Sequence, residues 1–349
     1  MVSVLKNTRR GAGKLALTAP YPSTDVARVS ALLAQCPSAS PTPLVDASDL
    51  GPVAALWVKD ERTRMNLGSF KALGAAYVIA CDAVKVEGAT PGRTALTGKT
   101  YVTASAGNHG MSVAAGARVF GANSVVYIAE TVPESFAARL RAQGAKVVRE
   151  GADYAESMVA AERAAVDKGW TLLSDSSWEN YTEIPHLLME GYLQMADEAI
   201  EQCPDTPTHI MLQAGVGGLA GAVAALVRAR WGNQPKIVVV EPEAAPALQK
   251  SVEAGHSVFA DGPDSIMGRL DCKEPSLIAL NGLARDADAF LTISDGEVTN
   301  VLPEMAEAGL DTTASGGAGV AVVLSADARQ QLGIDSTSRV LCFLSETSE

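Results

Sequence analysis

Residues 100–173 alternate short apolar segments with longer mixed segments, and this alternation constrains the fold more than any other feature of the sequence. Helices are predicted at 111–120, 134–143 and 154–168. Strands are predicted around them, at 101–105, 124–129, 146–149 and 171–173. Strands that alternate with helices of about ten residues predict βαβ units and therefore a parallel sheet. Active sites in such folds lie beyond the carboxyl ends of the strands.

The remainder of the chain predicts a second lobe of the same class. Strands are expected at 55–61, 208–213, 236–241, 290–293 and 339–343, and helices at 24–35, 184–202, 219–230, 277–283, 295–309 and 316–324. We therefore expect an α/β protein with two lobes, each a parallel-rich twisted sheet flanked by helices. Residues 75–185 are expected to form a small α/β domain, inserted into a large domain made of 1–74 and 186–349.

Lys71 follows Gly68, Ser69 and Phe70, and it precedes an apolar run at 75–80 that is typical of a helix. An ammonium group in this setting has two interpretations. Its stem can lie along apolar surface while the charge stays in water. Alternatively, desolvation lowers the pKa of Lys71, so that a neutral amine becomes available to attack a carbonyl group.

The segment 213–219 (Gln-Ala-Gly-Val-Gly-Gly-Leu) follows a predicted strand and opens a predicted helix. Its glycines let the backbone turn sharply and aim N–H groups inward, which together with the helix N-terminus makes a cradle for a phosphate. It is not a P-loop, because no Gly-Lys-Ser/Thr follows. A dinucleotide-binding turn stays open, with Glu241 as the acid near the end of the next strand, and so does a glycine turn needed only for packing.

Two further polar segments follow predicted strands. The turn at 105–110 (Ser-Ala-Gly-Asn-His-Gly) offers backbone donors and the side chains of Ser105 and Asn108, a set that suits a carboxylate. Alternatively, Asn108 is a left-handed turn residue and His109 a turn histidine with satisfied hydrogen bonds. Ser345 lies just beyond the last strand, as a cap or turn residue or as a hydrogen-bond donor to the crevice between the lobes.

Composition excludes several classes of function. The formal net charge of -12 argues against nucleic acid as a partner, because phosphate backbones need a basic face. The five cysteines have no paired close spacing, which favours free thiols in a reducing cytoplasm. The four histidines are scattered and no CxxC or HExxH occurs, so no metal site is expected. No apolar run approaches the ~18 residues that a membrane span needs.

An aldehyde cofactor with a phosphate tail and a ring nitrogen would use the lysine, the polar turn, the glycine loop and the strand-end serine together. On Ser69-Phe70-Lys71, the 105–110 turn and the glycine loop, the chain resembles the fold-type II pyridoxal-phosphate enzymes, which have a tryptophan synthase β-like fold and include the serine/threonine dehydratases. It is most similar to the diaminopropionate ammonia-lyases, over residues 40 to the end. That similarity rests on Lys59-Asp60-Glu61, on Asp-Ser-Ser-Trp-Glu-Asn-Tyr at 175–181 and on Ile-Met-Gly-Arg-Leu-Asp-Cys-Lys-Glu-Pro at 266–275.

The resemblance implies roles for particular residues. Lys71 would hold pyridoxal 5'-phosphate as a Schiff base and remove the α-proton of the substrate. Asn108 would bond to the ring hydroxyl, and Ser345 would face the pyridine nitrogen as a neutral donor, which suits β-elimination. Asp175 matches an acid that would contact the β-amino group, with a turn aspartate as the alternative. The phosphate would lie on Gly215, Val216, Gly217, Gly218 and Leu219, and the substrate carboxylate on Ser105, Ala106, Gly107 and His109.

One departure from the family pattern concerns stereochemistry. Ala106 stands where the lyase that takes both D and L substrates has an aspartate, and an alanine cannot take a proton on that face. The resemblance therefore implies an enzyme that eliminates the β-substituent of a small amino acid and converts L-2,3-diaminopropionate to pyruvate and ammonia. It also implies a homodimer in the cytoplasm. The alternatives are a dehydratase of serine, threonine or a 3-hydroxy amino acid, or a non-catalytic protein that binds an amino acid or a nucleotide.

Overall fold

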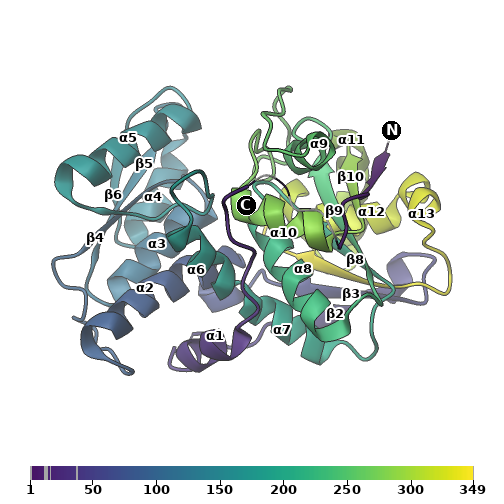
Figure 1. Ribbon diagram of the computed structural model, residues 1–349, viewed down its shortest axis with the longest axis horizontal. Coiled ribbons are helices and arrows are strands. Elements are labelled where there is room, and N and C mark those ends of the chain that lie inside the picture. Colours follow the sequence, from purple (N-terminus) through teal and green to yellow (C-terminus); the bar gives the residue numbers. More distant parts are fainter. Residues whose placement is uncertain (1, 12–14, 16, 37, 349) are drawn as a thin grey trace.

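The computed structural model describes residues 2–11, 15, 17–36 and 38–348. The chain forms two α/β lobes that lie side by side, as Figure 1 shows. Within the described residues, the strands make one sheet of seven and one sheet of four. The two-lobed α/β fold with parallel-rich sheets is the fold class that the sequence predicts.

The four-stranded sheet carries the smaller lobe and is parallel throughout. Val102 and Val125 face α5, whereas Val126 and Ile128 face α3 and α4, so alternate residues of the strands are buried on opposite faces. A parallel sheet covered on both sides in this way needs apolar residues at successive positions. The order of the strands is β6 (Lys146–Arg149), β5 (Asn123–Ile128), β4 (Thr100–Ala104) and β7 (Thr171–Leu172), and the helices are α2 (Lys71–Glu87), α3 (Asn108–Val119), α4 (Glu134–Ala142) and α5 (Tyr154–Lys168).

The seven-stranded sheet takes strands from both ends of the chain. Its five inner strands are parallel, and its two edge strands, β1 and β2, are antiparallel to their neighbours. The order is β1 (Ser3–Lys6), β10 (Ala289–Ile293), β9 (Lys236–Pro242), β8 (His209–Gln213), β11 (Arg339–Leu344), β3 (Ala55–Asp60) and β2 (Leu44–Asp46).

Helices cover both faces of the large sheet. Leu212 and Val239 belong to the core beneath α8 and α10, whereas Met211 and Val238 belong to the core beneath α12. The loops that leave the carboxyl ends of β3, β8 and β11 therefore meet at one edge of the sheet. The helices of this lobe and of its connections are α1 (Val26–Leu33), α6 (Glu183–Gly191), α7 (Leu193–Gln202), α8 (Gly218–Trp231), α9 (Ala247–Ala254), α10 (Leu277–Asp286), α11 (Asp295–Glu307), α12 (Ala314–Leu324) and α13 (Ala326–Leu332).

The predicted helix at 184–202 is wrong in one respect, because the structure has two helices that meet at Tyr192. The cause is the close approach of α2. A β-carbon on Gly191 would lie 2.7 Å from the carbonyl oxygen of Leu73, and a β-carbon on Gly74 would lie 2.8 Å from the Tyr192 ring. These contacts fix α6 against α2 at the residue where α6 ends.

A buried ionic cluster fixes the end of β3, from which the chain runs toward Lys71. The Lys59 ammonium donates to Glu198 at 2.8 Å, and the Arg64 guanidinium donates to Glu61 at 2.7 Å and to Glu198 at 2.6 Å. Burial lowers the pKa of Lys59, although the Glu198 carboxylate opposes that shift. Charges buried in this way are tolerated because each one is paired.

In the part of the chain that the structure covers, no helix is both long and apolar enough to cross a membrane. The predicted limits of the small domain, residues 75 and 185, fall within α2 and α6. Those limits stay a prediction.

Candidate active site

Lys71 is the first residue of α2 and lies at the carboxyl-end edge of the large sheet. The approach to it is a tight loop in which Met65, Asn66 and Gly68 have positive φ angles of 51°, 58° and 77°. The Phe70 N–H donates to the Ser345 carbonyl oxygen at 3.1 Å. This bond places the start of α2 directly beside the end of β11.

The Lys71 ammonium forms an ion pair and a short hydrogen bond with the Asp175 carboxylate. Burial alone would lower the pKa of Lys71, but the Asp175 carboxylate outweighs burial and raises it. Burial would raise the pKa of Asp175, but the Lys71 ammonium outweighs that effect and lowers it. The pair is therefore charged at neutral pH. This is the opposite of the lowered lysine pKa that desolvation predicts, because the sequence does not reveal the partner.

The loop that carries Asp175 is held in place by its neighbours. The Tyr181 hydroxyl donates to the Leu172 carbonyl oxygen at 2.9 Å and accepts from the Ser174 N–H at 3.1 Å. The Tyr181 ring stacks on Trp178 with their centroids 4.3 Å apart. These contacts make both aromatic residues supports of the loop between β7 and α6.

The glycine loop between β8 and α8 has the form of an anion cradle. Gly217 caps α8 with φ of 97°, no side chain caps the helix, and its first turn carries no acidic residue. A β-carbon on Gly215 would lie 2.9 Å from Cys272 Sγ and 3.0 Å from the Arg269 carbonyl oxygen. The N–H groups at the start of α8 are therefore available to bind an anion. The close packing around Gly215 leaves no room for a side chain at that position.

Tyr192 links this cradle to Lys71. Its ring lies 4.9 Å from the Phe70 ring, and a β-carbon on Gly218 would approach it to 3.4 Å. Its buried hydroxyl has no hydrogen-bond partner among the described residues, and burial raises its pKa. A buried hydroxyl without a partner beside a helix N-terminus and a lysine fits a bound group that carries a phosphate and an aldehyde.

The 105–110 turn lies at the N-terminus of α3, where Gly107 is the cap residue without a side-chain cap bond. A β-carbon on Gly110 would lie 2.2 Å from the Ser105 carbonyl oxygen, so the turn requires glycine there. His109 Nε2 donates to the Leu173 carbonyl oxygen at 2.8 Å, and burial lowers the pKa of His109. The His109 ring is therefore a neutral support of the turn, and its role in substrate binding stays a prediction.

Glu346 enters the site although sequence reasoning assigned it no role. The Asn108 amide donates to its Oε2 at 2.5 Å, Arg269 Nε lies 2.8 Å from the same oxygen, and Thr313 Oγ1 donates to Oε1. Glu346 is 4% exposed. Its neighbour Ser345 is also buried, with its N–H donating to the Gly316 carbonyl oxygen at 3.3 Å. The position directly after a predicted strand-end residue was the one signal that could have identified Glu346.

Cys272 is a second residue that sequence reasoning missed. Its thiol lies against the glycine loop, and burial, opposed by the nearby Lys71 ammonium, raises its pKa to about 11. The thiol is therefore protonated at neutral pH and acts as a small apolar wall. Cys272 lies in the Cys-Lys-Glu-Pro stretch, whose only signal in the sequence is its resemblance to the family.

Glu241 does not serve a nucleotide. Its two carboxylate oxygens accept from the Leu248 and Gln249 N–H groups at 2.7 and 2.8 Å, so the side chain caps the start of α9. Burial raises the pKa of Glu241 to about 8. The dinucleotide interpretation of the glycine loop loses its acid for that reason.

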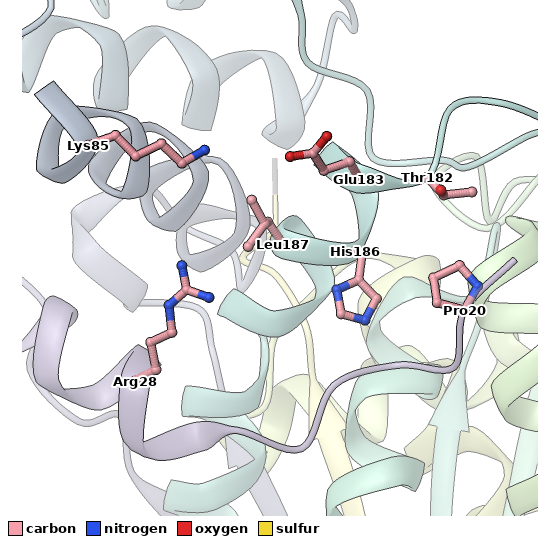
Figure 2. A pocket seen from close by; sticks show the side chains of 7 residues that line it. All are labelled: Pro20, Arg28, Lys85, Thr182, Glu183, His186 and Leu187. Atoms are coloured by element: carbon pink, nitrogen blue, oxygen red, sulfur yellow. The ribbon is translucent and has the colours of Figure 1, made fainter.

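The chain also has a surface pocket of about 410 Å³, and Figure 2 shows the side chains that line it. Lys85 lines it from the far end of α2, which is about 21 Å along the helix axis from Lys71. None of the residues that line this pocket belongs to the site around Lys71. Its other lining residues are Pro20, Arg28, Thr182, Glu183, His186 and Leu187.

Known proteins resemble the chain in sequence and in fold. The diaminopropionate ammonia-lyase of Salmonella typhimurium is 34% identical over 283 residues, which are 74% of this chain and 70% of that protein. A serine dehydratase-like protein of Rattus norvegicus is 28% identical over 248 residues, 69% of each protein. The crystal structure of diaminopropionate ammonia lyase from Escherichia coli in complex with D-serine matches with a TM-score of 0.87 and 27% identity, over 99% of this chain and 94% of that chain.

The pattern of the family described as pyridoxal-phosphate dependent enzyme matches residues 36–346. The match spans Lys71, the turn at the start of α3, the glycine loop and Ser345. It confirms the predicted cofactor, and the structural match confirms the predicted fold class. The chain therefore belongs to the family of pyridoxal-phosphate dependent enzymes.

Proposed function

We propose that the protein is an ammonia-lyase that converts 2,3-diaminopropionate, one water molecule being consumed, into pyruvate and two molecules of ammonia, with a preference for the L isomer. The similarity to diaminopropionate ammonia-lyase supports the substrate class. The observation that carries the proposal is the contact between Lys71 and Asp175. It puts an amine and a carboxylate together at the site.

When bound, pyridoxal phosphate supplies an aldehyde and an electron-withdrawing ring that stabilises negative charge at the substrate α-carbon. Lys71 would hold its aldehyde carbon, Asn108 its ring hydroxyl and Ser345 its ring nitrogen. The phosphate would bind the N–H groups of the glycine loop. The backbone cradle and the Tyr192 hydroxyl support this assignment.

Lys71 Nζ would take the proton from the substrate α-carbon, because it is the amine at the edge where the loops meet. Asp175 would hold the positive charge of the β-ammonium group of the substrate. The Lys71 ammonium holds the pKa of Asp175 low against burial, and a β-ammonium group in its place would likewise keep the carboxylate ionised. Held as an ammonium group beside Asp175, the leaving group would depart as ammonia without a further proton.

The turn at the start of α3 would fix the substrate by its carboxylate. Gly107 leaves the N–H groups of the first helical turn open, and helix N-termini favour negative charge. Ala106 in the same turn carries no group that can move a proton. The preference for L substrates follows, since Lys71 acts from one face.

The test is a panel of L- and D-β-substituted amino acids incubated with the protein and pyridoxal phosphate, with ammonia and 2-oxo acid measured. We expect L-diaminopropionate to give the highest kcat/KM and two ammonia molecules per pyruvate. A higher kcat/KM for L-serine or L-threonine would favour the dehydratase alternative, to which the serine dehydratase-like relative lends support. Absence of any turnover, together with a colourless protein after addition of the cofactor, would overturn both.

We also propose that the enzyme acts as a homodimer in the cytoplasm. Among the described residues all five cysteines are free thiols, which supports a reducing compartment. Light scattering of the purified protein measures the oligomeric state directly.

A further inference from the structure

The backbone of Arg269 is held in a fixed position over the glycine loop. Its carbonyl oxygen packs against Gly215, and its N–H donates to Ser315 Oγ at 3.1 Å. The chain just before it is tied to Asp295, which accepts from Ser265 Oγ at 2.5 Å and from the Ile266 N–H at 3.0 Å. Arg269 therefore extends from a firm support, and only its side chain has freedom to change partner.

The Arg269 side chain reaches across to the small lobe. A β-carbon on Gly107 would lie 3.9 Å from Arg269 Nε, which puts the guanidinium beside the cap of α3. The same Nε lies 2.8 Å from Glu346 Oε2, and the Arg269 side chain is 29% exposed. The guanidinium thus stands between a carboxylate of the protein and the turn that is free of acidic side chains.

We propose that Arg269 binds the α-carboxylate of the substrate at the turn of residues 105–109, and that Glu346 is its partner when no substrate is bound. This inference rests on the proposed function and adds a specificity-determining residue to it. A guanidinium and a helix N-terminus attract the same anion, and arginine matches a carboxylate with two parallel hydrogen bonds. Binding exchanges one carboxylate partner of Arg269 for another.

The exchange leaves no buried carboxylate without hydrogen-bond donors. Glu346 keeps the Asn108 amide and the Thr313 hydroxyl as donors when Arg269 turns away from it. Arg269 in turn keeps a negative partner. A partner exchange of this kind is less costly than breaking a buried ion pair outright.

The test compares two ligands that differ only in the carboxylate and carry no β-leaving group: L-alanine and L-alaninamide. Their affinity for the protein loaded with pyridoxal phosphate is measured from the change in its visible absorbance. We expect Arg269→Gln to weaken L-alanine about 10- to 100-fold, the range for a hydrogen-bonded charge, and to leave L-alaninamide unchanged. Arg269→Lys keeps the charge without the planar fork and should fall between.

Two further variants sharpen the result. Glu346→Gln removes the competing carboxylate, so L-alanine should bind more tightly than to the unchanged protein, while a parallel titration follows cofactor affinity. Arg230→Gln is the matched control, because Arg230, at the far end of α8, is 40% exposed and pairs with Asp197.

Equal weakening of both ligands in Arg269→Gln, or no weakening of L-alanine, would overturn the inference. Those outcomes concern the carboxylate alone, whereas failure to bind the cofactor at all would count against the proposed function.

Discussion

The Lys71 ammonium lies against the Asp175 carboxylate, although 104 positions separate the two residues in the chain. One residue begins α2, and the other lies in the loop between β7 and α6. Their side chains are 24% and 17% exposed, so solvent screens the pair only in part. Removal of either partner changes the protonation of the other, which makes both residues accessible to experiment.

Replacing Lys71 removes the amine on which the proposed chemistry depends. Lys71→Ala should lose turnover and should no longer retain the cofactor after borohydride reduction and denaturation. The measurement is the visible absorbance of the protein before and after reduction. Lys85→Ala is the control, since Lys85 lies on the same helix and is 59% exposed at its other end. A Lys71→Ala protein that retains reduced cofactor would show that another lysine holds it.

Replacing Asp175 isolates its effect on the lysine. In Asp175→Asn the attraction that raises the pKa of Lys71 is gone and burial dominates, so the pKa of Lys71 should fall. We expect kcat/KM for L-diaminopropionate to drop about 100-fold and its pH profile to shift. Turnover of L-serine should drop less, because serine carries no β-ammonium group. Equal losses for the two substrates would assign Asp175 a purely structural role.

The glycine loop can be tested by adding one methyl group. Gly215→Ala would bring its β-carbon within 3.1 Å of Cys272, Arg269 and Leu270 at once. We expect the affinity for pyridoxal phosphate to fall at least about tenfold, because the loop must shift from the N-terminus of α8. Gly268→Ala is the matched control, since a β-carbon there meets nothing within 4 Å. Cofactor titrations of both variants should therefore diverge.

Ala106→Asp tests the stereochemical proposal by adding a proton acceptor to the turn. We expect the variant to gain measurable turnover of D-diaminopropionate while it retains part of its activity on the L isomer. Ala106→Asn, which has a similar volume but no base, should not gain it. Equal turnover of both isomers by the unchanged protein would sink the proposal outright.

Glu241 predicts how stability depends on pH. Burial raises the pKa of Glu241 from 4.5 to about 8, so the folded state holds a proton that the unfolded state releases between these values. The contribution of Glu241 to the free energy of unfolding is complete below pH 4.5. It is lost as pH rises toward 8, by at most about 1.4 kcal/mol per pH unit. Denaturant unfolding at several pH values should show this slope, and Glu241→Gln should lack it. A Glu241→Gln protein with an unchanged slope would place the titrating group elsewhere.

Much of the fold follows from local pattern. The strands and helices between Thr100 and Leu172 lie where the apolar alternation predicts them. The reason is that the strands form a parallel sheet that helices cover on both faces. The short strand β1 escaped prediction because it is an antiparallel edge that exists only by pairing with β10. The break at Tyr192 escaped prediction because its cause, the backbone of Leu73, is distant in sequence.

The site divides in the same way. Lys71, Asn108 and the glycine loop occupy turns whose composition is visible in the sequence, and the structure brings them to one edge. Glu346 and Arg269 are ordinary charged residues in sequence, and they acquire meaning only because the chain carries Glu346 to Asn108, 238 positions away. The direction of the Lys71 pKa was likewise hidden until Asp175 was known to be its neighbour.

The glycine contacts between α2 and α6 bear on how the two lobes can move. Gly74 and Gly191 let the helices touch so closely that neither can slide past the other without a clash. Lys71, the first residue of α2, is thereby held in place relative to α6, and Asp175 lies in the loop that leads into α6. The contact of Asn108 with Glu346, by contrast, joins the start of α3 to the segment after β11 through side chains alone, so a spectroscopic reporter placed there would detect any change in how these two elements sit.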